Sequence, residues 1–420
     1  MDRNNLDFLI IAPTPFFANR GCHLRIRGEA EALRKKGSRL KIITFKEGKD
    51  VGGLVIKRSS LGVGRYGRGV AASWHNFPNG FFLFWNVLHE TIYRRPRVIY
   101  GHLFEGAAIG IVVKYLAFAL SLFSYNPLLV LDAQGSLRDE MREYGMLKNA
   151  FLLGGVGLIE RLILFFPDYV FTSSLRYQKR LKKLIRRQNI YHLPDGISFF
   201  EKNILRQKTS RLSGINEKKA ALLKIADSFT KEQSRLLRNW IGTRKKIILY
   251  AGSYAEAKGL PAFALEVLPR LIKNNHLRLL FGGGDFAAIP ASRKIFREGR
   301  DKIISLGNLD EKNLPYFLTL GDIALDLKPT NTSESSGKIL NYMAIGLPVV
   351  CYHNLNNRFF LRDGGFYARD ERELERQIIF LAGNPKLRKK SGRKNLARAW
   401  QELTWDKTAE KIIKLVSSNL

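Results

Sequence analysis

Residues 332–350 read TSESSGKILNYMAIGLPVV, and this stretch decides the fold. The spacing of its apolar residues predicts a helix over Gly337–Ala344, and the hydroxyl-rich loop before it supplies helix-capping groups. Gly346 ends that helix, and the apolar run Pro348–Cys351 is typical of a buried strand. A helix followed directly by a buried strand is the repeating unit of parallel sheets that are covered by helices.

The same unit recurs along most of the chain. We expect a first strand at Asp7–Ala12 and the helix Leu24–Lys36 after it. Further strands are predicted at Arg39–Phe45, Val51–Ile56, Val98–Tyr100, Leu128–Asp132, Tyr169–Thr172, Ile190–Leu193, Lys246–Ala251, Leu277–Phe281, Lys302–Leu306 and Ile323–Leu327. Repeated strand–helix units of this kind predict an α/β protein with two doubly wound, Rossmann-like domains in tandem.

A break in this pattern divides the chain. Residues 199–243 are rich in lysine and arginine and contain no strong strand, only an amphipathic helix at Lys231–Trp240. We therefore expect an N-terminal domain over residues 1–198, a basic linker with helical insertions over 199–243, and a C-terminal domain over 244–400.

The charge of the chain is far from balanced. Its 420 residues include 70 Lys and Arg but 37 Asp and Glu, which gives a formal net charge of +33. Such a charge favours an anionic partner: a nucleic acid, a membrane surface or a phosphorylated substrate. The two cysteines exclude a disulfide framework and a cysteine-rich zinc site, and they suit a reducing cytoplasm.

Two apolar segments and one basic segment bear on a membrane. Gly106–Phe123 contains a single charge, whereas Phe151–Phe166 is interrupted by Glu160 and Arg161. A buried helix of an α/β domain is the favoured interpretation, and a helix at a membrane interface or a membrane span remain alternatives. The helix predicted at Leu175–Arg187 is very basic. We expect its membrane-facing residues to be Arg176, Lys179, Arg180, Lys183 and Arg187, with a solvated surface or nucleic-acid binding as alternatives.

Candidate binding residues lie where predicted strands end. Tyr250–Gly259 is a strand followed by a glycine turn, with Lys258 just before the next helix, which favours a phosphate. The spacing differs from that of a Walker A loop. Glu334, Lys338 and Asn341 fall on neighbouring turns of one helical face, where they could hold a ribose and a diphosphate. A surface lysine and a solvated helix face are the simpler alternatives.

Three N-terminal segments occupy similar positions: Arg20–His23 before the first helix, His102 after a strand, and Asp132–Ser136, which we interpret as a turn. The sequence lacks the residue spacing that other classes of catalytic or binding site require. The sequence lacks a G-x-S-x-G elbow, the seven histidines have no metal-ligand spacing, and no G-x-G-x-x-G follows the first strand.

Taken together and in this order, these motifs resemble the GT-B glycosyltransferases of family four, the glycosyl transferases group 1 type. The resemblance is strongest over residues 246–370. It implies two domains that face each other across a cleft, with the acceptor bound by the N-terminal domain and a nucleotide sugar bound by the C-terminal one. It also implies a C-terminal helix, over residues 401–420, that crosses back to the N-terminal domain.

The resemblance also implies roles for single residues. Lys258 and Lys338 would bind the diphosphate of the donor, with Gly252, Ser253 and Gly337 around them. The catalytic set would be His102, Glu334 and Lys258, with His102 near the primary hydroxyl of the sugar and Glu334 near the transferred sugar. Asn341 would contact the ribose, and Gly21 would let the first loop approach the sugar and phosphate.

Four positions depart from the family pattern. Ser253 replaces an arginine, Asn341 replaces the second glutamate of a pair, and Cys22 replaces a second glycine. Glu334 lies one residue closer to Asn341 than usual, which leaves Ser333 at the strict position.

The function implied is transfer of a sugar from a UDP- or GDP-linked donor to a glycan or lipid-linked acceptor. Family four enzymes retain the anomeric configuration and need no metal, so we expect a hexosyltransferase of polysaccharide biosynthesis without metal or cofactor. We expect it in the cytoplasm, peripheral at the inner face of the cell membrane. One alternative is a non-catalytic basic module that binds anionic lipid or nucleic acid, and another is a GT-B phosphorylase or epimerase.

Overall fold

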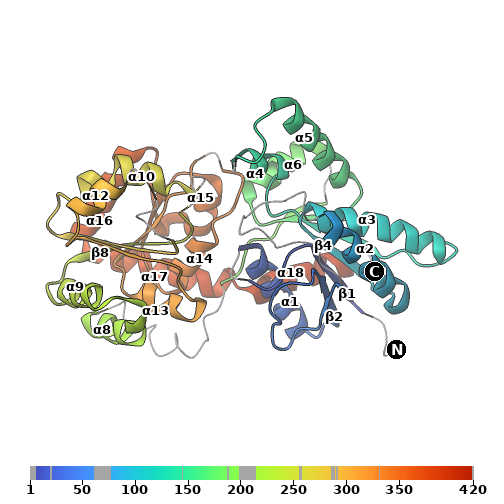
Figure 1. The fold of residues 1–420 in the computed structure, drawn as a ribbon, viewed down its shortest axis with the longest axis horizontal. Coiled ribbons are helices and arrows are strands. Elements are labelled where there is room, and N and C mark those ends of the chain that lie inside the picture. The colour runs from blue at the N-terminus through green and yellow to red at the C-terminus, as the bar shows by residue number, and fades with distance from the viewer. Residues whose placement is uncertain are drawn as a thin grey trace. The chain divides into compact units, whose positions relative to one another are not determined.

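The computed structural model describes residues 6–18, 21–60, 77–143, 145–186, 189–197, 214–254, 258–284, 289, 292–330 and 332–418 (Figure 1). The chain forms two compact units. The first comprises Met1–Gly196, Ser333–Ser335 and Thr404–Leu420, and the second comprises Ile197–Thr332 and Ser336–Leu403. Each unit is built on one parallel sheet covered by helices, so the predicted α/β fold with two Rossmann-like domains is confirmed.

The sheet of the first unit has the strand order β3-β2-β1-β4-β5-β6-β7, and every pair is parallel. The strands are β1 (Phe8–Ala12), β2 (Leu40–Thr44), β3 (Ile56–Arg58), β4 (Val98–His102), β5 (Leu128–Asp132), β6 (Tyr169–Thr172) and β7 (Ile190–His192). The central strand β1 is buried on both faces, which explains its unbroken apolar sequence. Phe8 and Ile10 belong to one core cluster, whereas Leu9 and Ile11 belong to another.

Helices cover both faces of this sheet. The helices are α1 (Gly21–Lys35), α2 (Phe77–Arg94), α3 (Leu103–Leu120), α4 (Leu137–Glu143), α5 (Ala150–Phe165), α6 (Leu175–Ile185) and α18 (Trp405–Ser417). α1 and α18 supply buried side chains to the Phe8 cluster, and α2 and α3 supply them to the Leu9 cluster. α18 packs along α1 so tightly that a Cβ on Gly28 would lie 2.2 Å from Trp405 Cε2.

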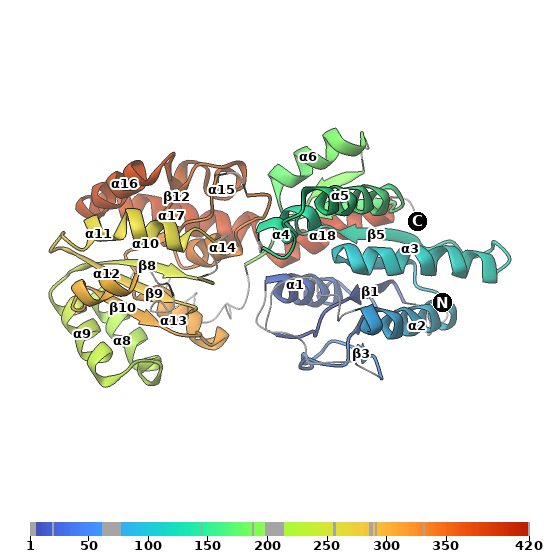
Figure 2. The ribbon, with the colours of Figure 1, turned by 45° about the horizontal axis from the view of Figure 1, so that its top comes forward.

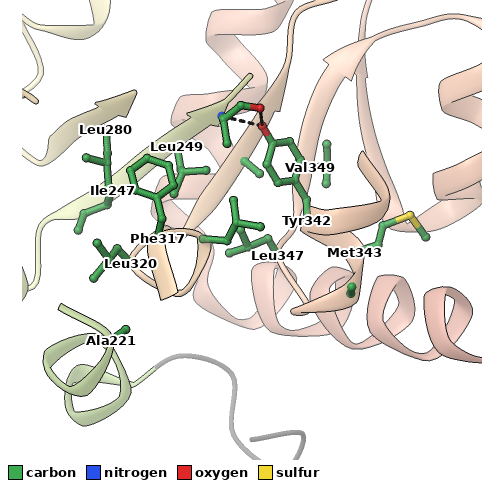
Figure 3. Close-up of a cluster of buried hydrophobic side chains, with 14 of the residues drawn as sticks. Ala221, Ile247, Leu249, Leu280, Phe317, Leu320, Tyr342, Met343, Leu347 and Val349 are labelled. Atoms are coloured by element: carbon green, nitrogen blue, oxygen red, sulfur yellow. Dashed lines mark hydrogen bonds between the residues drawn. The ribbon is translucent and has the colours of Figure 1, made fainter. Parts of the chain in front are cut away.

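The sheet of the second unit has the order β10-β9-β8-β11-β12-β13. Its strands are β8 (Lys246–Ala251), β9 (Leu277–Gly282), β10 (Ile303–Leu306), β11 (Ile323–Asp326), β12 (Val349–Tyr352) and β13 (Gly365–Ala368). Its helices are α8 (Ile215–Lys224), α9 (Lys231–Gly242), α10 (Leu260–Glu266), α11 (Leu268–Leu271), α12 (Ser292–Glu298), α13 (Leu314–Thr319), α14 (Gly337–Ala344), α15 (Leu355–Leu361), α16 (Glu371–Gly383) and α17 (Pro385–Glu402). Figure 3 shows one of its two core clusters, in which Tyr342 reaches the backbone of Ala251 from α14.

Helices α8 and α9 belong to the second unit, although the sequence analysis assigned them to a linker. Ala221 and Trp240 are buried in the same cluster as Phe317. Figure 3 labels Ala221 and Phe317 in this cluster. Lys218 is buried and pairs with Asp322 at 2.7 Å between Nζ and Oδ2. Each helix has one narrow apolar stripe that packs on the domain. The basic composition of the surrounding sequence made these stripes hard to recognise.

Most predicted elements differ by a few residues at their ends, and two segments differ more. β3 covers Ile56–Arg58 instead of Val51–Ile56, because a turn at Gly53 with a positive φ of 81° precedes it. The sequence pattern predicts one helix over Gly259–Asn274, but the structure divides it into α10 and α11, where Pro269 lies in the first turn of α11 and has no N–H to donate. A glycine-rich loop is also predicted at residues 62–69, which lie outside the described residues.

The apolar segment Gly106–Phe123 forms most of α3 and the turn after it. Among the described residues, Leu103–Leu120 is the one helix long and apolar enough to cross a membrane by length and composition, and 39% of it is buried. Its inner face packs on β4 and β5 through Ala107, Gly110 and Val113. α3 is therefore a sheet-covering helix of the α/β domain with an exposed outer face.

Candidate active site

One group of polar side chains gathers at the carboxyl end of the second sheet. It is formed by the end of β8, the end of β11 and the first turn of α14. Parallel strands place their ligand-binding loops at this edge, because the helices that follow begin there. The residues concerned are Tyr250, Gly252, Asp326, Ser336 and Lys338.

Lys338 is held at a fixed place in this group. Its Nζ donates to the hydroxyl of Tyr250 at 3.0 Å and lies 4.3 Å from the centroid of that ring. Asp326 Oδ1 is 3.6 Å away from the same nitrogen. A cation over an aromatic face and beside a carboxylate is stabilised in its charged form. The ammonium group is therefore oriented before any ligand arrives.

Gly252 provides the room for this arrangement. A Cβ at this position would lie 3.2 Å from both Cε and Nζ of Lys338. The absence of a side chain lets the lysine lie directly against the backbone that leaves β8. The same feature lets a ligand approach that backbone closely.

The start of α14 faces this group without a side-chain cap. Ser336 occupies the capping position, but its hydroxyl donates to Asp326 Oδ1 at 2.8 Å and makes no cap hydrogen bond. The amides in the first turn of a helix carry partial positive charge and attract anions. Gly337 and Lys338 contribute amides of that first turn, and Gly337 is exposed.

Two further lysines act on the same place. Burial, followed by the charge of Asp326, raises the pKa of Tyr250 above its ordinary value, whereas Lys258 and Lys328 lower it. These lysines therefore lie near the Tyr250 hydroxyl, which donates to the carbonyl of Ser253 at 2.8 Å. Lys258 directly precedes Gly259, whose φ is +77° and whose Cβ, if present, would overlap the carbonyl of Leu327. The group thus contains more lysine than carboxylate.

The structure brings together several residues that the sequence singled out. Gly252, Ser253, Lys258, Gly337 and Lys338 all lie at this edge, and Asn341 follows Lys338 after one turn of α14, half buried. Glu334 is half buried in the loop before α14. Sequence reasoning missed Tyr250, Asp326 and Lys328. The sequence did indicate these residues, because each is a polar or aromatic residue where a buried strand ends.

A second group lies at the carboxyl end of the first sheet, around Arg25 of α1. The guanidinium donates to both carboxylate oxygens of Asp132, at 2.8 and 2.7 Å, and to Asp195 Oδ1 at 2.7 Å. It also lies 2.9 Å from Glu29 Oε1. His102 Nδ1 is 3.0 Å from Asp132 Oδ2. Asp132 therefore joins a buried ion-pair network in addition to ending β5.

Burial controls the charges in this network. Burial raises the pKa of Glu29 to about 7, against the lowering effect of Arg25. Burial also works against the charge of Asp132, but Arg25 and His102 hold the pKa of that carboxyl below its ordinary value. Glu29, His102 and Asp132 lie close enough to share a metal ion. The guanidinium of Arg25 already supplies the positive charge that balances these carboxyl groups.

The candidate residues of the N-terminal domain differ in burial and in their position in the fold. The side chain of His102 is fully buried in the network, at 0% exposure, so it lines no open surface in this structure. Gly21 begins α1, and a Cβ there would meet no atom within 4 Å. The basic helix α6 ends at Ile185, with Lys179, Arg180 and Lys183 exposed and Arg176 half buried. Arg187 and Arg20 lie outside the described residues.

The C-terminal domain matches a known protein family. Residues 245–384 match the model of the family Glycosyl transferases group 1. This range is a third of the chain and most of the C-terminal domain. The matched range contains both lysine-bearing loops and the whole of α14, so the resemblance inferred from the sequence is confirmed there, and the chain is a glycosyltransferase.

The fold of the whole chain is similar to solved GT-B glycosyltransferases. It matches sucrose-phosphate synthase from Thermosynechococcus elongatus with a TM-score of 0.72, 14% identity and 98% of each chain covered. It matches HepE from Anabaena in complex with UDP-glucose with a TM-score of 0.68, 12% identity, and 99% of this chain and 100% of that chain covered. It matches WaaG, a glycosyltransferase involved in lipopolysaccharide biosynthesis, with a TM-score of 0.65, 13% identity, and 98% and 100% covered. No curated protein matches the chain in sequence.

Proposed function

We propose that this glycosyltransferase transfers a sugar from a UDP- or GDP-linked donor to a glycan or lipid-linked acceptor in the cytoplasm. The observation that carries the proposal is the position of Lys338, held over Tyr250 beside Gly252 at the open start of α14. A diphosphate is the ligand that this group suits. It carries compact negative charge and accepts hydrogen bonds from amides and ammonium groups.

The same contacts suit the departure of the diphosphate. When the bond between the sugar and the diphosphate breaks, negative charge grows on the leaving oxygen. Lys338, Lys258 and the α14 amides are positioned to stabilise that charge, and preorganised donors of this kind supply a large part of many rate enhancements. We propose that the reaction needs no metal and retains the anomeric configuration, with the acceptor attacking from the face that the diphosphate leaves.

The remaining assignments are those that the family resemblance implies. Asn341 has an amide that can hydrogen bond to ribose hydroxyls, and it lies one turn beyond Lys338. Glu334 is assigned to the transferred sugar. His102 is assigned to its primary hydroxyl, and this role requires that the buried imidazole become accessible when the donor binds.

Donor binding tests the proposal directly. Lys258→Ala and Lys338→Ala should each weaken binding of the preferred nucleotide sugar by about 10- to 100-fold, because each removes a charge-assisted hydrogen bond. Titration calorimetry with UDP-, GDP- and ADP-sugars measures the effect. Lys294→Ala is the matched control, because Lys294 is a lysine of the same domain with an 82% exposed side chain. Donor binding and turnover unchanged in both site variants would refute the assignment.

Two measurements test the chemistry. Proton NMR of the first product formed should show the anomeric configuration of the donor, and an inverted product would exclude the proposed route. Turnover should persist in excess EDTA with the same rate constant, and a loss restored by a divalent cation would contradict the metal-independent mechanism.

A further inference from the structure

Two neighbouring helices of the first unit expose an unusual amount of apolar surface. We call this surface the apolar face. Its side chains, all at least 39% exposed, are Val112, Tyr115, Leu116 and Leu120 of α3, Leu122 and Phe123 after α3, Phe151, Leu152, Leu158, Ile159, Leu162 and Phe165 of α5, and Phe166 after α5. Scattered exposed leucines are ordinary in proteins, but contiguous apolar patches mark sites where a membrane or a protein partner binds.

The apolar face is continuous across the two helices. α3 and α5 are in contact and lie side by side in Figure 2. The ring of Tyr115 on α3 packs edge-on against that of Phe166, with centroids 6.1 Å apart, although both side chains remain at least 40% exposed. The spacing on α5, from Phe151 through Leu158 and Leu162 to Phe165, is that of one helical stripe.

The buried sides of these helices are already used. α5 buries Leu153, Glu160 and Leu164, and the Glu160 carboxylate accepts hydrogen bonds from Ser136 and Tyr177. α3 buries Ala107, Gly110 and Val113 against the sheet. The apolar face is therefore an addition to the core of the domain, and folding of the domain does not account for it.

The end of α3 places two of these side chains at an exposed tip. Leu122 is 85% exposed and Phe123 is 69% exposed. Both adopt positive φ, of 52° and 66°, a conformation that costs a non-glycine residue roughly 1 kcal/mol or more. The backbone thus turns in a strained conformation while both apolar side chains remain in solvent.

Positive charge borders the apolar face. Between residues 145 and 186 the sequence has eight lysines and arginines but two acidic residues, Glu160 and Asp168. Glu160 is buried, and Asp168 pairs with Lys114 at 2.6 Å. Helix α6, which contacts α5, exposes Lys179, Lys182 and Lys183, and Arg186 is exposed just after it, whereas Arg180 pairs with Asp139. Apolar and aromatic side chains beside lysine and arginine are the composition of surfaces that enter the interface of an anionic bilayer.

We propose that the apolar face of α3 and α5 inserts into the interfacial layer of an anionic lipid bilayer, with α6 contacting the headgroups. The basic border selects a bilayer over a second copy of this chain, because two copies paired through this surface would bring their own positive charges together. This inference does not depend on the donor proposed above, because its test contains no nucleotide sugar.

Vesicle flotation of the full chain tests the proposal, with phosphatidylcholine vesicles that contain or lack phosphatidylglycerol. Leu158→Asn/Leu162→Asn changes the α5 part of the face at positions that are 58% and 55% exposed. Leu122→Asn/Phe123→Asn changes the tip, and asparagine tolerates positive φ better than the native residues, so folding is preserved. Leu223→Asn is the matched control, because Leu223 is 72% exposed on α8 of the other unit.

Each double variant should weaken vesicle binding by about tenfold or more, and Leu223→Asn should leave it unchanged. Lys182→Gln/Lys183→Gln should remove most of the preference for phosphatidylglycerol. Binding of both apolar-face variants at the wild-type level, with native circular dichroism, would overturn the proposal. A dimer in sedimentation velocity that Leu158→Asn/Leu162→Asn dissociates, without any effect on vesicles, would also overturn it in favour of a second copy.

Discussion

The two sheets end in groups of charged residues that are organised in opposite ways. At the carboxyl end of the first sheet, Arg25 is 2% exposed and forms ion pairs with Asp132, Asp195 and Glu29. Its charge is therefore neutralised inside the domain. At the corresponding end of the second sheet, Lys338 is 14% exposed and Asp326 is 3.6 Å away. The same topology thus supports a closed acidic network in one domain and a lysine-rich group beside a helix start in the other. Of the two groups, the lysine-rich one is suited to bind an anionic ligand.

The largest expected effect concerns the closed network. Arg25→Met should lower the free energy of unfolding by about 3–5 kcal/mol, because it leaves Asp132 and Glu29 buried without their counter-charge. Urea unfolding followed by circular dichroism measures this loss. Arg27→Met is the control, since Arg27 is 25% exposed and pairs with Glu31, and it should cost less than about 1 kcal/mol. Equal losses of unfolding free energy in the two variants would show that Arg25 stabilises the fold no more than a partly exposed arginine with one partner.

The pH dependence of stability sharpens the same point. Burial raises the pKa of Glu29 to about 7 from an ordinary value of 4.5, so the folded state holds a proton that the unfolded state has lost between these values. The contribution of Glu29 to stability should be fully present below about pH 4.5 and fall towards pH 7, by at most about 1.4 kcal/mol per pH unit. Arg25, Asp132, His102 and Tyr100 face this carboxyl.

Glu29→Gln should flatten this part of the profile, measured by urea unfolding at a series of pH values. Glu31→Gln serves as the control, because Glu31 is 39% exposed and should leave the slope as it is. The buried His192, whose pKa is lowered to about 4, changes stability in the opposite direction over the same range, so the comparison with the variant isolates Glu29. A slope identical in wild type and Glu29→Gln would contradict the assignment.

The smallest expected effect compares two glycines. Gly252→Ala should weaken donor binding by about 3- to 10-fold, roughly 1 kcal/mol, because the new methyl group displaces Lys338. Gly80→Ala is the control and should leave the affinity unchanged, since a Cβ there meets no atom within 4 Å and Gly80 has no assigned donor contact. Calorimetric titration of both variants measures the difference. A loss in Gly80→Ala as large as that in Gly252→Ala would show that the effect is not specific to the site.

Much of the fold could be predicted because its strands are short, apolar and regularly spaced. The expected ranges Leu128–Asp132, Tyr169–Thr172 and Gly337–Ala344 agree with β5, β6 and α14 to the residue. Buried parallel strands have this continuous apolar sequence. α8 and α9 could not be assigned to a domain, because only tertiary packing shows where a short apolar stripe is buried.

The lysines of the C-terminal site could be predicted because they lie close to glycines and helix starts along the chain. The Arg25 network could not, since its partners Asp132 and Asp195 are 107 and 170 residues away in sequence. His102 was correctly placed at a strand end, but no local pattern signals that its side chain is enclosed by groups from α1 and β5.

The position of α18 has a consequence for how the protein is made. Ala409, Ile412 and Val416 lie in the same cluster as the first strand, and Lys35 pairs with Asp406, 371 residues later, at 2.5 Å. During translation, the first domain leaves the ribosome without one of its core helices. It cannot complete its core until the entire second domain has been synthesised. A chain truncated before Thr404 and released from the ribosome should therefore present an unfinished, protease-sensitive first domain beside a finished second one.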